Sequence, residues 1–297
     1  ALLSRSAPEP YSRSAAHLTP TSIEVSKSDS KRPRAPGPLL QLLEHRAWFE
    51  AGASLALLPL WRLAPKGDGH PVLVLPGLGA GDESTAIMRT FLSSLGYAVN
   101  PWGLGMNFGL RPGVLDSVRE LLRTLAAQHQ RKVSLVGWSL GGIMARELAK
   151  ELPEITRLVI SMGSPFTGHP RDTNAWRMYE WMSGHKIGSA DLHEPLRTTP
   201  PVPTTSLWSR TDGVVSWHCS VERTNKHAEN IVIDASHFGI GMHPLALYAI
   251  ADRLAQPEGE WQHFKREGWK ALAYADPQIH ISKLKEAKPA DTAAHGK

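Results

Sequence analysis

The stretch that decides the fold of this chain is 133–142, which reads V-S-L-V-G-W-S-L-G-G. It begins as a short apolar run, typical of a buried strand, and passes directly into a helical pattern at 140–151. Ser139 is therefore expected on a sharp turn between strand and helix. Gly137 and Gly141, two residues to either side, remove side chains that would collide with the adjoining strand and helix. Because the N–H groups of a helix N-terminus favour negative charge, the stretch predicts a nucleophilic serine rather than a purely structural turn.

On both sides of this stretch, short apolar runs bounded by glycine and proline alternate with longer helical segments. That alternation is typical of a parallel sheet built from strand–helix–strand units. The sequence therefore predicts the α/β fold class, with a mostly parallel sheet flanked by helices. The predicted strands are 71–75, 97–100, 132–136, 157–161, 204–208 and 230–233, and the predicted helices are 84–95, 114–129, 140–151 and 243–254.

The same reading divides the chain into three parts. Residues 1–38 are rich in Ser, Pro, Arg and Lys and are predicted to be a flexible tail, because they cannot bury enough apolar surface to offset chain entropy. Residues 39–257 are predicted to form one catalytic domain. Within it, the segment at about 166–203 breaks the rhythm and is predicted to be a short cap insertion. Residues 258–297 are predicted to hold a helix at 261–273 and a polar tail.

Residues 39–63 carry two clusters of leucine and predict one or two helices, broken at Pro59. The simpler interpretation is that the apolar residues pack against the catalytic domain. The alternative is an amphipathic helix on a membrane surface, and with it a peripheral contact with lipid. Only Arg46 and Arg62 would supply positive charge to such a contact.

Charge and cysteine content exclude several classes of function. The formal net charge is +5, but residues 1–36 carry six basic and three acidic side chains, and residues 258–297 carry seven and six, which leaves 37–257 near +1. A folded basic face for nucleic acid is therefore not expected. The single cysteine, Cys219, excludes an intramolecular disulfide and a multi-cysteine metal site.

The location of the protein in the cell is weakly determined by its sequence. The chain has no run of about 18 apolar residues of the kind that spans a membrane. Its start also lacks the pattern of a secretory signal. A cytoplasmic location is favoured, whereas secretion or peripheral membrane association stays open if an N-terminal segment has been removed.

A serine hydroxyl needs a base within hydrogen-bond reach, held in turn by an acid. His237 follows the last predicted strand and precedes the last predicted helix, where the sites of open α/β sheets collect. The alternative bases are His243, which starts that helix, and the less favoured His218. Asp212, in a tight Asp-Gly turn after the strand 204–208, is the predicted acid. Asp234 competes with it, although a strand-end cap is its simpler role.

Two backbone N–H groups are predicted to form an oxyanion hole. The first is that of Leu140, directly after the nucleophile. The second is that of Leu78, in the loop P-G-L-G-A-G that follows the strand 71–75. A nucleotide-binding loop is the alternative for this glycine-rich stretch, but the spacing lacks the last step of the dinucleotide motif and no Gly-Lys-Ser/Thr follows.

Together, the stretches 76–79, 137–142, 211–215 and 236–239 resemble the bacterial α/β-hydrolase superfamily, specifically its lipase- and esterase-like members with P-G-L-G in the first loop. The resemblance covers about 70–255. The resemblance implies an eight-stranded core, from which the first strands can be missing in this chain. It also implies a cap inserted after the sixth strand, and the segment 166–203 occupies that position. Many relatives carry histidine before the first glycine of that loop, where this chain has Pro76.

The expected pocket is apolar. An aromatic cluster in the insertion could line an acyl site or cover it as a lid, or it could only pin the cap to the core. The loop that starts at Trp102 lies at another strand end and could share the pocket. The predicted substrate is therefore a small ester with an apolar acyl group. The candidate substrate-binding residues are Trp102, Met106, Trp138, Trp176, Tyr179 and Trp181.

The sequence thus predicts a serine esterase or lipase that works through an acyl-enzyme on Ser139, with no cofactor, no metal and no nucleic-acid partner. An acyltransferase, a thioesterase or an amidase would use the same side chains, since pocket shape and water exclusion choose the acceptor. A binding or scaffold protein that keeps the fold without turnover is the alternative of a different class. The sequence gives no oligomeric state.

Overall fold

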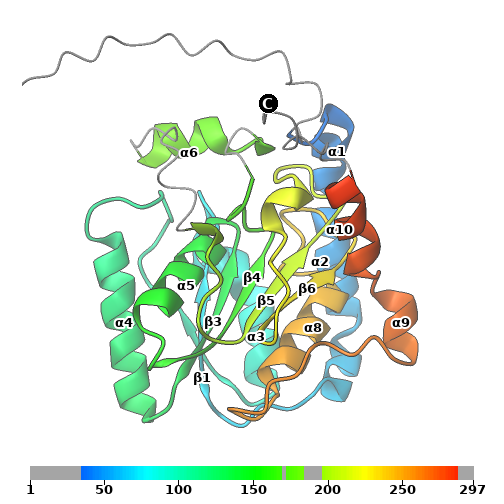
Figure 1. Cartoon of the computed structure of the whole chain (residues 1–297). Helices are drawn as coiled ribbons and strands as arrows, with labels where there is room; N and C mark the ends of the chain where they lie inside the picture. Colours follow the sequence, from blue (N-terminus) through cyan, green and yellow to red (C-terminus); the bar gives the residue numbers. More distant parts are fainter. Residues whose placement is uncertain (1–34, 169–171, 184–195, 287–297) are drawn as a thin grey trace, which may run out of the picture. The chain divides into compact units, whose positions relative to one another are not determined.

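The computed structural model describes residues 35–168, 172–183 and 196–286 of the chain. In this part, six strands form one sheet in the order β2-β1-β3-β4-β5-β6, and every neighbouring pair is parallel (Figure 1). The predicted parallel sheet is confirmed, with six strands instead of eight in the described residues. The strands are β1 Pro71–Leu75, β2 Ala98–Pro101, β3 Val133–Trp138, β4 Thr156–Met162, β5 Thr204–Trp208 and β6 Ala228–Val232.

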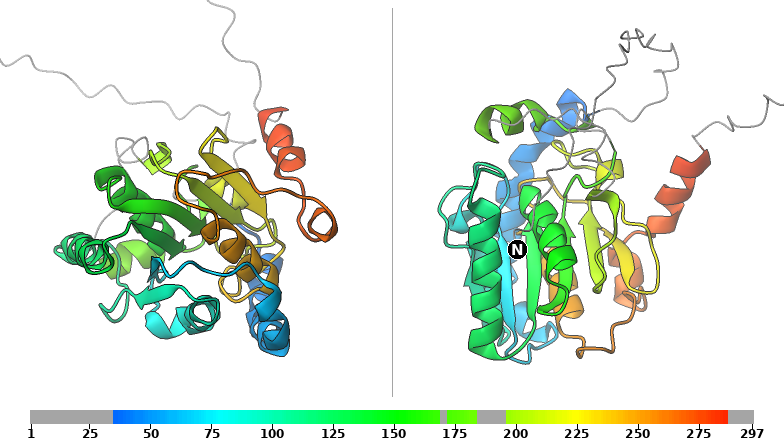
Figure 2. Two further views of the ribbon diagram at one scale, coloured as in Figure 1. Left: turned by 90° about the horizontal axis from the view of Figure 1, so that it is seen from below. Right: turned by 60° about the vertical axis from the view of Figure 1, so that its left-hand side comes forward.

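Helices cover both faces of the sheet, which explains why the central strands are apolar without alternation. Helices α3 (Ala86–Ser94) and α8 (Pro244–Leu254) pack on one face, and α4 (Val114–His129) and α5 (Leu140–Glu151) pack on the other (Figure 2). Successive residues of β1 belong to the two cores in turn, because side chains alternate across a strand. A short helix, η4 (Asp82–Thr85), precedes α3.

The segment before the sheet forms α1 (Pro38–Leu42), η2 (Leu43–Arg46), α2 (Ala47–Ala56) and η3 (Leu58–Leu63). The interpretation that its apolar residues pack against the domain is wrong for several of them, since Leu39 is 69% exposed and Trp48 is 82% exposed. Glu44 and Glu50 are buried in their place. The two acids contact loops of the sheet, whereas Trp61 of the same segment is buried and packs against Phe91 of α3, so the segment docks through both polar and apolar contacts. The membrane-surface alternative stays a prediction.

The predicted helix at 261–273 is wrong over most of its length. A helix, α9, covers only Trp269–Ala273, and α10 (Pro277–Glu286) follows it. The residues before α9 run along the edge strand β6, where the Phe264 N–H donates to Glu229 Oε2 (2.6 Å). Gly268, with φ of +57°, separates this stretch from α9. Covering an open sheet edge prevents it from pairing with other chains.

The insertion after β4 contains helix α6 (Trp176–Ser183). Residues 169–171 and 184–195 of the insertion lie outside the described residues. The same holds for residues 1–34 of the tail predicted at 1–38 and for residues 287–297 of the predicted C-terminal tail. A short helix, η7 (Trp217–Ser220), lies between β5 and β6. Of the helices that the structure describes, none has the length and apolar content needed to cross a membrane.

Candidate active site

Ser139 occupies the sharp turn between β3 and α5. Its φ of +53° and ψ of −119° are rare for a residue with a side chain. The Ser139 N–H donates to Met162 O of β4 (2.8 Å), which holds the turn to the sheet. A side chain at Gly137 would overlap the backbone of Gly141, and one at Gly141 would overlap the backbone of Leu75. The two glycines are therefore needed for the close approach of α5 to the strands.

Three side chains from distant parts of the chain meet at this turn. His237 Nε2 lies 3.1 Å from Ser139 Oγ, and His237 Nδ1 lies 2.7 Å from Asp212 Oδ2. Each residue follows the carboxyl end of a strand: β3, β5 and β6. The other oxygen of Asp212 accepts the N–H groups of Val214 (2.8 Å) and Val215 (2.7 Å), which fixes the carboxylate.

The electrostatic environment favours a protonated His237. Burial alone lowers the pKa of His237, but the charge and hydrogen bond of Asp212 and the charge of Glu44 outweigh it, so that the pKa is raised above its usual value. The Asp212 carboxylate also fixes the ring with its Nδ1 proton toward Asp212, which leaves Nε2 free to accept the Ser139 proton. The arrangement can thus take a proton from Ser139 and hold it.

The alternative residues are engaged elsewhere. His243 caps α8 by accepting the Leu245 N–H (3.2 Å), and His218 Nδ1 lies 2.9 Å from Ser216 Oγ. Asp234 forms an exposed ion pair with Arg210 (3.2 Å). Of the residues considered for base and acid, His237 and Asp212 are the ones that the structure brings to Ser139.

The loop that follows β1 carries the Leu78 N–H, and its Gly77 lies so close to the Trp138 ring that a side chain there would press on it. The neighbouring N–H groups are used, since Gly79 donates to Asn107 O (2.7 Å) and Ala80 donates to Gly77 O (3.2 Å). No backbone acceptor for the Leu78 or Leu140 N–H occurs in the part of the chain that the structure describes. Both groups are therefore available to a negatively charged oxygen.

Comparison with known proteins shows the fold. No family model matches the chain. Lipase B of Aspergillus fumigatus superposes with a TM-score of 0.50 and 16% identity, over 64% of this chain and 54% of that one. This chain has the α/β-hydrolase fold. An α/β superfamily hydrolase of Oenococcus oeni is similar over 63% of this chain and 91% of that one, with 19% identity and a TM-score of 0.45.

One curated relative of this α/β-hydrolase-fold chain is a 2-hydroxy-6-oxo-2,4-heptadienoate hydrolase of Pseudomonas putida. It is 32% identical over 106 residues, which are 33% of this chain and 38% of the relative. The match thus spans well under half of the relative's length.

Among the predicted pocket residues of this hydrolase fold, two tryptophans support loops. Trp102 is only 2% exposed, and its indole N–H donates to Gly105 O (2.8 Å). The Trp138 indole N–H donates to His237 O (3.0 Å), so this side chain holds the histidine loop. Met106 is 53% exposed and could contact a substrate.

The cap residues are less closely defined. Trp176 and Tyr179 are half-buried on α6, and Tyr179 packs against the core that contains α4 and α5. The side chain of Trp181 lies outside the described residues. Arg111 joins the cap to the body by donating to Met182 O (2.7 Å).

Sequence reasoning missed several residues that build the site. Asn107 is fully buried and donates to Pro76 O (2.8 Å), which pins the loop of Leu78. Gly163 has φ of +54°, and a side chain there would press on His237 and Asp212. The sequence signal for a role of Gly163 in the site was its position directly after the end of a strand. Glu44 and Glu50 carried a weaker signal, as the two acids of the leucine-rich segment 39–63.

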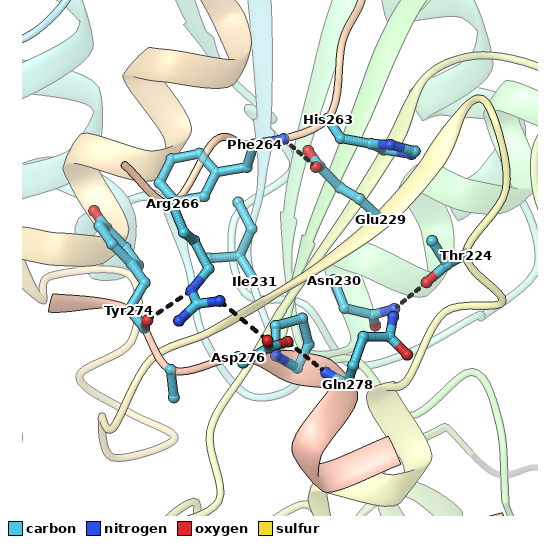
Figure 3. A pocket seen from close by; sticks show the side chains of 12 residues that line it. Thr224, Glu229, Asn230, Ile231, His263, Phe264, Arg266, Tyr274, Asp276 and Gln278 are labelled. Carbon is cyan, nitrogen blue, oxygen red and sulfur yellow. Dashed lines mark hydrogen bonds and ion pairs between the residues drawn. The ribbon is translucent and has the colours of Figure 1, made fainter. Parts of the chain in front are cut away.

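A hollow of about 310 Å³ lies beside β6, and Ser139, Asp212 and His237 are not among the residues that line it (Figure 3). Its polar groups pair with one another. Arg266 forms an ion pair with Asp276 (3.3 Å), and Asn230 donates to Thr224 Oγ1 (3.2 Å). These pairs leave no reason to assign a ligand. In the described residues, no group of three or more His, Cys, Asp or Glu side chains is placed to hold a metal ion.

Proposed function

We propose that the chain is a serine hydrolase that cleaves carboxylic esters with an apolar acyl group. The observation that carries the proposal is the unbroken line of contacts from Ser139 Oγ through the His237 ring to Asp212. The relatives named hydrolase and lipase support hydrolysis by this fold, whereas the ester bond is inferred from the chemistry of the site.

In the proposed reaction, Ser139 Oγ attacks the carbonyl carbon and passes its proton to His237 Nε2. The N–H groups of Leu78 and Leu140 bind the oxygen that becomes negative. The C–O bond to the alcohol breaks as His237 protonates the alcohol, which leaves an acyl group on Ser139. Water then attacks this acyl-enzyme and gives its proton to His237. That proton returns to Ser139 as the acid leaves.

The apolar acyl group is proposed from the surroundings of the site. Phe238, directly after the histidine, is 52% exposed, and Leu104 and Met106 are 42% and 53% exposed on the loop that contacts the Leu78 loop. Exposed apolar side chains grouped at a site favour contact with an apolar ligand. Rates on p-nitrophenyl esters of graded acyl length measure this preference, and a marked preference for charged acids would contradict it.

The deciding experiment is labelling by a fluorophosphonate probe, which reacts with activated serines. Wild type is expected to be labelled at neutral pH, and Ser139→Ala is expected to lose labelling completely. A wild type that folds but stays unlabelled would favour a scaffold protein instead. Product analysis with competing alcohols then separates hydrolysis from acyl transfer.

A further inference from the structure

The carboxylate of Glu44 joins the two loops that carry His237 and Asp212. Glu44 is 7% exposed. Its Oε1 accepts the N–H of His237 itself (2.9 Å) and that of Gly213 (2.6 Å), the residue after Asp212. Its Oε2 accepts the N–H of Phe238 (3.0 Å). One side chain therefore fixes the backbone on both sides of the contact between His237 and Asp212.

A second carboxylate, that of Glu50 on α2, supports the same loops from nearly two turns further along the segment. Glu50 is 8% exposed and accepts the N–H (2.8 Å) and the hydroxyl (2.5 Å) of Ser236, the residue before the histidine. Arg46 pairs with Glu50 (3.2 Å) and donates to Thr211 O (2.9 Å), the residue before the aspartate. We call Glu44, Arg46 and Glu50 the carboxylate clamp.

Resting on the function proposed above, we infer that Glu44 is a positioning residue for His237 and that its buried charge stabilises the imidazolium formed during the reaction. The two acids of the clamp differ in a way that assigns this role to Glu44. Glu50 is neutralised by Arg46, whereas Glu44 is held by backbone N–H groups. Backbone N–H groups form strong, charge-assisted hydrogen bonds to a carboxylate.

The charged groups around His237 come from three directions. Asp212 faces the Nδ1 side of the ring, and Glu44 acts from η2, where its charge raises the pKa of His237. The Arg46–Glu50 pair touches the residues just before Asp212 and His237. The Arg210–Asp234 pair is exposed and screened by solvent. Glu44 is therefore the buried charge, other than Asp212, that acts on the ring.

The test compares Glu44→Gln with wild type for hydrolysis of p-nitrophenyl butyrate. The substitution removes the charge and turns an amide NH₂ toward a backbone N–H. We expect kcat to fall about 10- to 100-fold, because a small misplacement of a catalytic group is costly, while KM changes little. We also expect the acidic limb of the kcat/KM profile to move to lower pH, because the base must be neutral to act.

Two further variants separate this role from a purely structural one. Glu50→Gln is expected to lower the melting temperature without moving the acidic limb. Glu44→Asp keeps the charge but shortens its reach, so it should lower kcat and leave the limb at its wild-type position. Glu120→Gln, an exposed acid on α4, is the surface control.

The inference is overturned if Glu44→Gln retains both the wild-type kcat and the wild-type acidic limb, or if Glu50→Gln moves the limb equally. If Glu44→Gln does not fold, a wild-type kcat in Glu44→Asp overturns it. Loss of labelling and hydrolysis in wild type itself would instead refute the proposed function, so the two failures are distinguishable.

Discussion

Two groups of serine, histidine and aspartate occur along the same strand, β3. One contains Ser139, after the carboxyl end of the strand. The other contains Ser134, near its amino end, where His70 Nε2 lies 2.8 Å from Ser134 Oγ and His70 Nδ1 lies 2.5 Å from Asp68 Oδ1. Judged by contacts alone, the two groups are equivalent.

Their surroundings are opposite. Ser134 is fully buried within β3 and paired with β1 and β4, next to a register shift between Val133 and Ser134. Asp68 also binds Arg131 (2.5 Å) and Arg157 (3.1 Å). Burial, together with the charges of these arginines, lowers the pKa of His70 to about 4, although Asp68 acts against this shift. The same three residue types therefore make a packing group with a neutral histidine in one place and a candidate proton relay in the other.

The largest difference is expected from the two aspartates. Asp212→Asn should reduce kcat on p-nitrophenyl butyrate by about 10⁴-fold, because the amide favours the wrong tautomer of the histidine. Asp68→Asn should leave kcat unchanged and lower stability, since it weakens the ion pair with the buried Arg157. Steady-state kinetics and thermal melts of both variants measure this contrast. Equal losses of kcat would remove the distinction between the two groups.

An intermediate effect is expected on the pH dependence of stability. His70 binds a proton near pH 4 in the folded chain but near 6.5 when unfolded. Between these values the unfolded state binds more protons, so the free energy of unfolding falls as the pH drops, by about 3 kcal/mol from this group. His70→Gln should lose this part of the dependence in urea unfolding between pH 7 and 4. An unchanged slope would show that His70 is not held neutral.

The smallest effect is expected from Ser134→Ala. Its fluorophosphonate labelling should match that of wild type, in contrast to Ser139→Ala. Its stability should fall by about 1–3 kcal/mol, because His70 Nε2 loses its buried partner. Loss of labelling in a folded Ser134→Ala protein would contradict the assignment of the nucleophile to Ser139.

The sequence predicted strands and helices correctly where the local pattern of apolar residues and glycines agrees with the fold. The bounds of β1, β5, α4 and α5 match the predicted ranges, because apolar runs and glycine signals lie within short windows. Ser139 could be singled out for the same reason, since strand, turn and helix are contiguous. Placing Asp212 and His237 needed only the order of the strands.

The remaining features depend on contacts between distant residues. The segment of Glu44 offers only the weak signal of an acid among leucines, because the burial of Glu44 depends on contacts with Gly213 and His237, which are distant in the chain. The group of Ser134 joins residues that are 64 positions apart. The segment before α9 is extended rather than helical because its polar groups bond to β6 and to Asn225 before that strand instead of to each other.

The carboxylate clamp has a consequence for where the functional unit of the protein starts. A shortened chain beginning at β1 would keep the six strands of the sheet and the turn of Ser139, but it would lose Trp61 and Ala64 from the core on the side of α3 and α8. It would nevertheless lose the acceptor of the N–H groups of Gly213, His237 and Phe238. Such a fragment would keep the strands but lose the brace between the loops of Asp212 and His237, so the proposed positioning role needs the chain from η2 onward.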